Sequence, residues 1–481
     1  MDKLKRLKKD IKTVRRNELI VRILKYAAMT VGALALLAFS FVRVVGNRID
    51  TDGLKPTALL QLASSPNGAS IFVDDVEKNF RTPNEVVLDI GSHAVKMTLN
   101  GYHDWQKNFD MVQGQVLWLN YALFVPTDLQ TDDVANVANN IRDMVKSRDN
   151  KWILLQHLPF NSFSMLSVNN PTNIQVNNFS LPADTLSPAD EGTEPDLAIV
   201  EGDVGSRYFL FKYSFISGGA EKVEYIYLDR TNLKVAYNLT REFAIDIKQI
   251  SFHQHGERQF YIIDSGDNLR LLDYNNKSVS APLVEHALKF SQYDEKLTSI
   301  SLDSKGEKTV GVTYRGKYRA IKTFDVAAPV DAYFVNYYNK DHVVVTDGKT
   351  IFNIAEPLDD APKETELDAG LDKIDWLRVN NSGRIILAGS ASAVMSYDQE
   401  TKHRGEYQAP TRPYFVDDFH VAWRTAAGSG KVVLADFDGD NQYTLPLSGQ
   451  TIFLSNDKKY LFSLQKIDDK NVLQRSKMIV D

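Results

Sequence analysis

The sequence predicts a mainly β protein that carries one N-terminal transmembrane helix. Three observations lead to this fold class. An uncharged apolar run follows a basic N-terminus, short alternating strands fill residues 57–126, and a hairpin pattern then recurs about every 44 residues over residues 127–481. With 481 residues, of which 43% are hydrophobic, the chain is too long for one ordinary core, so we expect more than one domain.

The first expected element is a transmembrane helix at residues 26–45. Its stretch YAAMTVGALALLAFSFV has 17 residues without a charge, and apolar residues before it bring the run near the roughly 20 residues that span a bilayer. Because residues 1–25 are strongly basic, the positive-inside rule predicts a cytoplasmic tail and extracytoplasmic C-terminal domains. A signal peptide cleaved near Ala33-Leu34-Ala35 is the alternative. That site lies inside the apolar run, which is longer than the usual signal-peptide core of about 7–15 residues.

Composition excludes several classes of function. The chain has no cysteine, which rules out disulfides, thiolate nucleophiles and cysteine metal sites. Residues 1–50 hold 12 Lys and Arg against 4 Asp and Glu, which leaves 44 against 58 in residues 51–481, a net charge of −14. Phosphate binding needs clustered cations, so no nucleic-acid partner is expected for this acidic body.

Residues 57–126 are expected to form a small β-sandwich. Runs with alternating apolar residues are separated by the turn signals Pro66-Asn67-Gly68, Asn100-Gly101 and Gln113-Gly114. Such a pattern predicts a meander of six short antiparallel strands. In the first turn, Pro66 fixes φ and Gly68 permits a positive φ, so we interpret this turn as a hairpin and not as a binding site.

The order of these residues resembles the PEGA domain, which is named for its Pro-x-Gly-Ala turn. The resemblance covers nearly all of residues 58–125. It rests on Ser65-Pro66-Asn67-Gly68-Ala69, Thr82-Pro83, Gly91-Ser92-His93 and Asn100-Gly101-Tyr102. Asp75 and Phe80 depart from the family, which usually has glycine there, so the loop at 75–81 is expected to differ in shape. The resemblance implies an extracytoplasmic spacer or interaction module without enzymatic activity.

Residues 127–481 repeat a pattern of strand, polar hairpin, strand, turn and strand. The hairpins lie near Asn150, Gly205, Gly256, Gly306, Lys340, Gly383, Asp418 and Lys458. A period of about 40–50 residues with four strands per unit is typical of a β-propeller, here with seven or eight blades. In several units a third strand is expected to end in an aspartate or a polar turn. These strands are LRLLDYN (269–275), AIKTFDV (320–326), AVMSYDQ (393–399) and VVLADFD (432–438).

Two hairpins, SRDNKWILL at 147–155 and SNDKKYLFSL at 455–464, are similar to those of TolB-type and WD-repeat propellers. The Trp-Asp and Gly-His dipeptides of WD repeats are absent. The last unit is one strand short, and residues 132–140 either supply that outer strand or form a short linker helix, since apolar residues there also fall at helical spacing. The Pro-rich, acidic stretch at 182–196 predicts a solvated loop between the first two blades.

The strongest candidate metal ligands are Asp436, Asp438 and Asp440 in DFDGDN. An EF-hand loop needs glycine at its sixth position and glutamate at its twelfth, where this chain has Asn441 and Leu447. A hairpin turn is therefore preferred, and a shallow Ca²⁺ site is the alternative.

Two further motifs suggest chemistry. His253 and His255 share one side of a strand, but a third metal ligand is not identifiable, so a polar hairpin tip is preferred. The GSGKV stretch at 428–432 lacks the glycine and the Ser/Thr of a phosphate loop and is rejected. No catalytic residue and no cofactor are identified.

These predictions favour a membrane-anchored binding or scaffold protein at the cell membrane. The expected partners are the membrane and a protein, peptide or cell-wall ligand. Aromatic residues are plentiful in the propeller, for example Tyr333, Phe334, Tyr337, Tyr338, Trp376, Tyr414, Phe415 and Trp423. Most are expected in the blade cores, and any at blade rims are potential parts of a partner or sugar platform. The alternatives are a propeller enzyme acting on envelope glycans and a structural envelope protein.

Overall fold

The computed structural model describes residues 29, 47–50, 53–134, 140–147, 150–158, 160–203, 205, 207–426, 430–447, 452–467 and 470–480. These residues form a mainly β structure, as predicted, with one 3₁₀ turn (η1, Ala183–Thr185) and one short helix (α2, Leu239–Phe243). The chain divides into two compact units, Met1–Phe124 and Val125–Asp481.

The predicted tail at 1–25 and transmembrane helix at 26–45 lie, except for Met29, outside the described residues. Among the residues that are described, none belongs to a helix with the length and apolar character needed to cross a bilayer.

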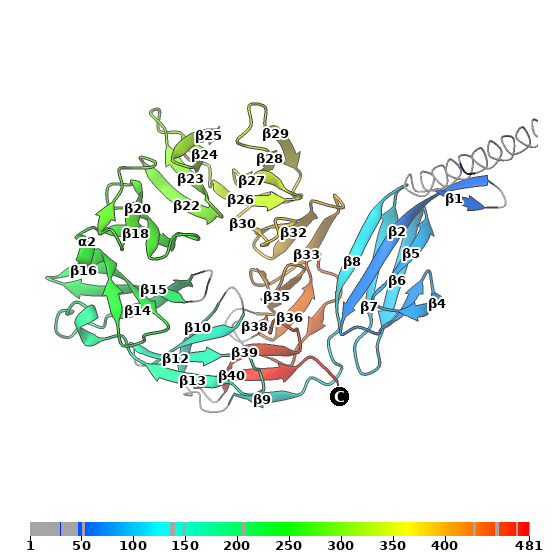
Figure 1. The fold of residues 1–481 in the computed structure, drawn as a ribbon, viewed down its shortest axis with the longest axis horizontal. Coiled ribbons are helices and arrows are strands. Elements are labelled where there is room, and N and C mark those ends of the chain that lie inside the picture. The colour runs from blue at the N-terminus through cyan, green and yellow to red at the C-terminus, as the bar shows by residue number, and fades with distance from the viewer. Residues whose placement is uncertain are drawn as a thin grey trace, which may run out of the picture. The chain divides into compact units, whose positions relative to one another are not determined.

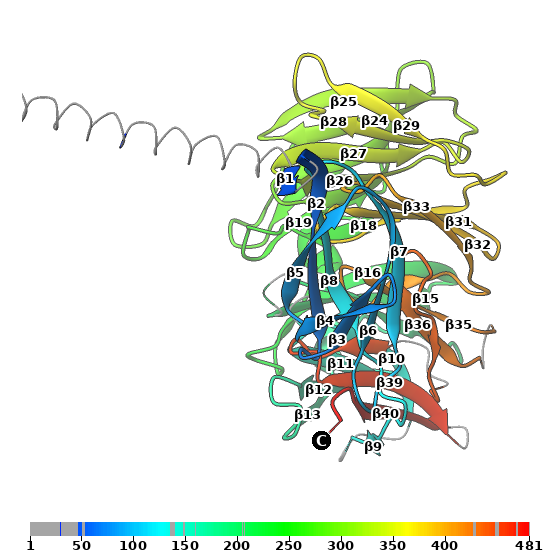
Figure 2. The same ribbon diagram turned by 90° about the vertical axis from the view of Figure 1, so that its right-hand side faces the viewer.

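The first unit is a sandwich of two four-stranded sheets, which can be followed in Figure 2. In one sheet β2 pairs with β1, β5 and β8, and in the other the order is β4-β3-β6-β7. The strands are β1 (Asn47–Asp50), β2 (Gly53–Ser65), β3 (Ser70–Val73), β4 (Val76–Arg81), β5 (Asn84–Asp89), β6 (Gly91–Thr98), β7 (Trp105–Met111) and β8 (Val116–Leu123). Fully buried side chains such as Leu60, Ile71 and Trp105 fill the space between the sheets.

The predicted meander is wrong in its strand order. The long strand β2 pairs antiparallel with β5 and parallel with β8, the last strand of the unit. Alternating apolar residues correctly indicated strands with one buried face, but this pattern carries no information on which strands become neighbours.

The Ser-Ser-Pro-Asn-Gly turn joins β2 to β3, which belong to different sheets, so it is not the hairpin that the sequence predicted. Thr82 holds the turn through its hydroxyl and through its backbone, whose carbonyl accepts from the amide of Gly68 at 2.9 Å. Thr82 Oγ1 accepts hydrogen bonds from the amides of Gly68 (3.1 Å) and Ala69 (3.0 Å), and it lies 2.6 Å from Ser64 Oγ. Gly68 has φ +96°, as expected for the glycine of this turn. At the next turn, Asp74 and Asp75 also have positive φ values of 52° and 61°, which explains why glycine is usual near this position.

The described residues of the second unit form eight four-stranded sheets, which follow one another around a ring in chain order (Figure 1). The first strand of each sheet lies nearest the centre of the ring. The first four sheets, blades 1 to 4, consist of β10 (Ile141–Lys146), β11 (Trp152–His157), β12 (Ser162–Ser167) and β13 (Gln175–Phe179); β14 (Asp196–Gly202), β15 (Tyr208–Ser217), β16 (Ala220–Asp229) and β17 (Ala236–Asn238); β18 (Ile247–Phe252), β19 (Gln259–Asp264), β20 (Leu269–Asp273) and β21 (Ser278–Val279); and β22 (Ala287–Tyr293), β23 (Lys296–Leu302), β24 (Lys308–Tyr314) and β25 (Lys317–Phe324).

Blades 5 to 8 complete the ring. They consist of β26 (Asp331–Tyr337), β27 (Lys340–Thr346), β28 (Ile351–Ala355) and β29 (Lys363–Leu367); β30 (Trp376–Val379), β31 (Ile385–Ser390), β32 (Ala393–Asp398) and β33 (Arg404–Gln408); β34 (Tyr414–Phe415), β35 (His420–Arg424), β36 (Val432–Asp436) and β37 (Tyr443–Thr444); and β38 (Ile452–Leu454), β39 (Tyr460–Ile467), β40 (Lys470–Lys477) and β9 (Thr131–Asp133). Of the two blade numbers that the sequence allowed, the structure has eight.

The last blade is closed by a strand from before the first blade. β9 pairs antiparallel with β40, with Thr131 opposite Ser476 and Asp133 opposite Gln474. The outer-strand interpretation of residues 132–140 is therefore confirmed for 132–133, and the strand begins at Thr131. Residues 135–139, where a linker helix was the alternative, lie outside the described residues.

One predicted hairpin is displaced by one strand. Gly306 lies between β23 and β24, the second and third strands of blade 4, whereas the first hairpin of that blade turns at Asp294. Asp294 adopts φ 54° without being glycine, so the Gly306 turn gave the stronger sequence signal. AIKTFDV at 320–326 was predicted to contain a third strand that ends in an aspartate. Because of the same shift, Asp325 instead follows β25, the fourth strand of blade 4.

A side chain at the start of the second strand binds an aspartate at the end of the third strand in several blades. We call this pair the strand clasp. Asp398 accepts from Arg384 Nε at 2.8 Å and Nη2 at 2.7 Å, and in another blade Asp273 accepts from Gln259 Nε2 at 2.7 Å. Arg384 and Asp398 are 8% and 2% exposed, so this blade 6 clasp is a buried ion pair.

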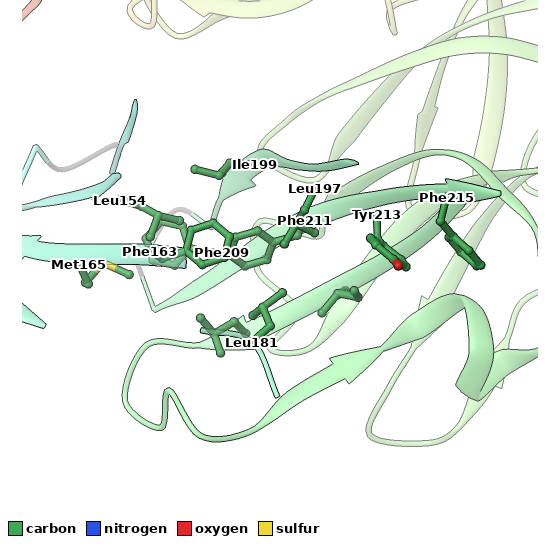
Figure 3. Close-up of a cluster of buried hydrophobic side chains, with 12 residues drawn as sticks. Leu154, Phe163, Met165, Leu181, Leu197, Ile199, Phe209, Phe211, Tyr213 and Phe215 are labelled. Carbon is green, nitrogen blue, oxygen red and sulfur yellow. The ribbon is translucent and has the colours of Figure 1, made fainter. Parts of the chain in front are cut away.

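Neighbouring blades are joined by apolar side chains. Figure 3 shows the cluster between blades 1 and 2, where Phe163 meets Phe211 with ring centroids 5.1 Å apart. The stretch at 182–196 adds to this cluster through Leu186, and Asp190 accepts from the amides of Gly218 (3.0 Å) and Gly219 (2.9 Å) at the tip of the β15–β16 hairpin. The expected solvated loop is therefore a strap that is packed against blade 2.

Candidate functional site: an amide-lined hollow across four blades

A hollow of about 630 Å³ crosses blades 3 to 6 where the inner strands β22, β26 and β30 run into their first hairpins. We call it the amide hollow, because five of its twelve lining residues carry a primary amide. The lining consists of Gln254, Gln292, Tyr293, Asp294, Lys296, Tyr333, Phe334, Val335, Asn336, Val379, Asn380 and Asn381. Its volume falls within the range of about 300–1,000 Å³ that is typical of small-molecule sites.

Part of the lining exists because the inner strand of a blade has one backbone edge without a neighbouring strand. Gln249 of blade 3 covers this edge in blade 4, since its Nε2 donates to the carbonyl of Phe290 at 3.0 Å and its Oε1 accepts from the same residue's amide at 3.4 Å. Gln254 of blade 3 also binds the backbone of blade 4, because its Oε1 accepts a hydrogen bond from the amide of Asp294 at 2.8 Å. These glutamines fix the blade 3 side of the hollow by joining two blades.

The charged groups of the hollow are paired. Lys296 Nζ lies 3.1 Å from Asp341 Oδ2, and Asn336 Nδ2 donates to Asp341 Oδ1 at 2.9 Å. Asp294 Oδ1 lies 2.5 Å from His255 Nε2, and this hydrogen bond lowers the pKa of the Asp294 carboxyl group. Paired charges of this kind favour a ligand without a large net charge.

Tyr333 contributes a hydrogen-bonding hydroxyl group on the β26 wall. Burial, together with the charge of Asp331, raises the pKa of Tyr333 to about 12, so its phenol is protonated at neutral pH. The hydroxyl lies 3.3 Å from Asp331 Oδ2, to which it donates.

One acceptor in the hollow has no partner. Gln292 Nε2 donates to the carbonyl of Asp294 at 2.7 Å, whereas Oε1 is buried without a hydrogen bond within the described part of the chain. A buried acceptor without a partner costs about 1–3 kcal/mol. Because this oxygen is buried, a ligand in the hollow can donate to it only after the Gln292 side chain rotates. Tyr293 and Phe334 also line the hollow, with ring centroids 6.1 Å apart, but Phe334 is 4% exposed and packs mainly into the core.

The structure places the candidate calcium ligands in another blade. Asp436 ends β36 of blade 7, where its Oδ2 accepts from Asn441 Nδ2 at 2.8 Å, and Asp438 Oδ1 accepts from the amide of Asp440 at 3.3 Å. These contacts are those of a turn. Over the described residues, no group of three or more His, Asp or Glu side chains has an arrangement that would hold a metal ion.

The two histidines also have local partners. The His253 ring stacks on Tyr261 with a centroid distance of 5.0 Å, and its Nδ1 accepts from the amide of His255 at 3.1 Å. Burial, followed by the charge of His255, lowers the pKa of His253. His255 instead contacts Asp294 at the edge of the amide hollow, so the polar hairpin tip predicted from the sequence contributes to the wall of the site.

Sequence reasoning named Tyr333 and Phe334 only among eight propeller aromatics, most of them expected in blade cores, and it missed Gln254, Gln292 and Asn336. A signal was available: successive repeats place a primary amide near the end of the inner strand. Because amides are common in hairpins, this signal becomes specific only once the inner strands are aligned.

Comparison with known proteins identifies a family for the first unit. Residues 57–125 match the PEGA domain family, which confirms the resemblance in the first unit. No similar sequence was found among curated proteins.

Several solved structures are similar to the chain. Dihydro-heme d1 dehydrogenase NirN in complex with DHE is 12% identical with a TM-score of 0.42, and the alignment covers 64% of this chain and 66% of NirN, just under two thirds of its length. Kluyveromyces lactis Hsv2 is 13% identical with a TM-score of 0.39, covering 71% of this chain and 100% of Hsv2. The β-propeller domain of Myceliophteria thermophila Cps50 (Swd1) is 9% identical with a TM-score of 0.39, covering 72% of this chain and 99% of that domain.

Proposed function

We propose that this chain is a membrane-anchored extracytoplasmic binding protein that presents its propeller, through a PEGA domain, to a protein, peptide or cell-wall partner. The amide hollow carries the proposal. It combines five primary amides, paired charges and the ring of Tyr293. These groups supply hydrogen bonds and apolar contact, which is the chemistry of recognition.

The proposed anchoring rests on the basic segment at 1–25 and the apolar run at 26–45. Tethering confines the binding domain to a thin layer beside the membrane, which raises its effective concentration for a partner in the same layer. Protease treatment of intact cells tests this topology. The prediction requires cleavage of residues 53–480 from outside and protection of an epitope placed before residue 26.

The binding proposal is tested by capture from envelope extract with the full-length chain in detergent micelles. Gln292→Ala with Asn381→Ala removes two amides of the hollow, and Gln175→Ala is the control, because Gln175 is an exposed glutamine of blade 1. We expect a partner, identified by mass spectrometry or glycan analysis, that the parent and Gln175→Ala retain and the double variant loses. Equal capture by all three proteins would exclude the hollow as the binding site. Circular dichroism checks that each variant is folded.

A further inference from the structure

A hollow other than the amide hollow lies on the PEGA sandwich, on the solvent face of its β5-β2-β8 sheet. In β8, Leu117 and Leu119 point into the core, whereas Trp118 and Asn120 face solvent. Trp118 is 37% exposed. Val87 and Val116, which are 43% and 42% exposed, lie on the same face, so Trp118 belongs to an exposed apolar patch, and such a patch is a mark of a binding surface.

Strand register brings polar groups beside this indole. Gln61 of β2 is opposite Glu85 of β5 on one side and opposite Trp118 of β8 on the other. With neighbouring strands about 4.8 Å apart, the row Glu85-Gln61-Trp118 extends across roughly 10 Å of the sheet. Such a row is long enough to contact a short oligosaccharide.

The hollow over this row measures about 460 Å³, and Asn84 and Asn120 also line it. Within the described part of the chain, the side chains of Gln61, Glu85 and Asn120 and the indole N–H of Trp118 make no hydrogen bond or ion pair. The surface therefore offers an apolar ring surrounded by donors and acceptors that are available to a ligand.

We infer that this hollow binds an oligosaccharide of neutral hexose units. The C–H face of a pyranose ring packs on an indole, and its hydroxyl groups both donate and accept, so they can satisfy Gln61, Asn120 and Glu85 together. A protein partner would need a separately matched group for each of these side chains. Since the only charged side chain in the lining is that of Glu85, a carboxylate, an anionic sugar would be disfavoured.

The test measures binding of neutral tetrasaccharides, namely cellotetraose, chitotetraose and maltotetraose, to the full-length chain in nanodiscs by calorimetry. We expect at least one to bind, and Trp118→Ala to weaken it about tenfold, which corresponds to about 1.4 kcal/mol for the loss of a stacked ring. Trp118→Phe should retain part of the affinity. Val112→Ala is the control, since Val112 is 62% exposed on the same unit and does not line the hollow.

Several outcomes would overturn the inference: no binding of any neutral tetrasaccharide at about 10 mM, tighter binding of tetragalacturonate than of all three, or unchanged affinity in Trp118→Ala. Capture of a protein that competes at Trp118, without glycan binding, would assign the surface to a protein partner instead. The Gln292→Ala/Asn381→Ala protein should bind the sugar normally, so failure of this inference and failure of the propeller proposal are distinguishable.

Discussion

The strand clasp of blade 6 leads to a quantitative prediction for Asp398→Ala. The substitution removes both hydrogen bonds to Arg384 and those from the amide of Glu400 (2.9 Å) and from Thr401 Oγ1 (3.0 Å). Removing one partner of a buried ion pair typically costs about 3–5 kcal/mol. In Asp398→Ala, Arg384 retains its ion pair with Glu400, in which Nη1 lies 2.5 Å from Oε2. We therefore expect a loss of unfolding free energy at the lower end of this range, about 3 kcal/mol.

Hydrogen exchange read by mass spectrometry measures this change locally. Peptides that cover β31 and β32 should exchange roughly a hundredfold faster in Asp398→Ala, because each 1.4 kcal/mol changes an opening equilibrium about tenfold. The control is Glu364→Ala, which removes the more exposed Lys322–Glu364 pair and should cost about 1 kcal/mol or less. Combining Asp398→Leu with Arg384→Met should exchange more slowly than Asp398→Ala, since both buried charges of the clasp are removed and Glu400 keeps the hydrogen bond from the Tyr338 hydroxyl at 2.9 Å. Exchange within about threefold of the parent in Asp398→Ala would refute the reasoning.

Three further predictions concern other contacts. Thr82→Val removes the hydroxyl that holds the first turn of the sandwich and should lower the unfolding free energy by about 1–3 kcal/mol in thermal denaturation, whereas Thr82→Ser should lose less. Burial acts to lower the pKa of His93, but the hydrogen bond with Asp74 raises this pKa above the ordinary 6.5. The stabilisation that protonated His93 gives to the fold is therefore complete below about pH 6.5 and is lost as the pH rises through the raised pKa. Asp74→Asn should flatten this part of the curve of unfolding free energy against pH. Val134→Pro removes the amide that donates to the Leu473 carbonyl at 3.0 Å, so limited proteolysis should cut faster beside β9 than in the parent.

The sequence was sufficient for most strands, because these depend on local patterns, and it left the number of blades at seven or eight. Period-two alternation identified β8, and turn residues located seven of the eight first hairpins. The blade 4 error at Gly306 shows the limit of such signals, since the true hairpin turns at Asp294 without a glycine. Strand order in the sandwich was also inaccessible, because alternation defines a buried face and not the neighbour that covers it.

The candidate sites depend on distant parts of the chain. Gln254 and Asn380 line one hollow although more than a hundred residues separate them, and neither belongs to a contiguous motif. On the sandwich, Gln61 and Trp118 meet only through a parallel pairing of the first and last long strands. The sequence identified Tyr333 and Phe334 as aromatic candidates, but the amides beside them acquire meaning only from the fold.

The closing strand β9 also imposes an order in time. Gln474 Nε2 donates to Asp133 Oδ1 across a sequence separation of 341 residues, whereas blades 1 to 7 each form from one continuous stretch of chain. Joining ends so far apart costs about 5 kcal/mol of loop entropy in a flexible chain, and this cost falls as the intervening blades fold and bring the ends together. During synthesis, the seven contiguous sheets can therefore form as they leave the ribosome, whereas β9 can pair only after β40 has been synthesised. Ring closure is expected to be the last step, and a chain interrupted before β40 would keep an unpaired strand edge through which it can associate with other chains.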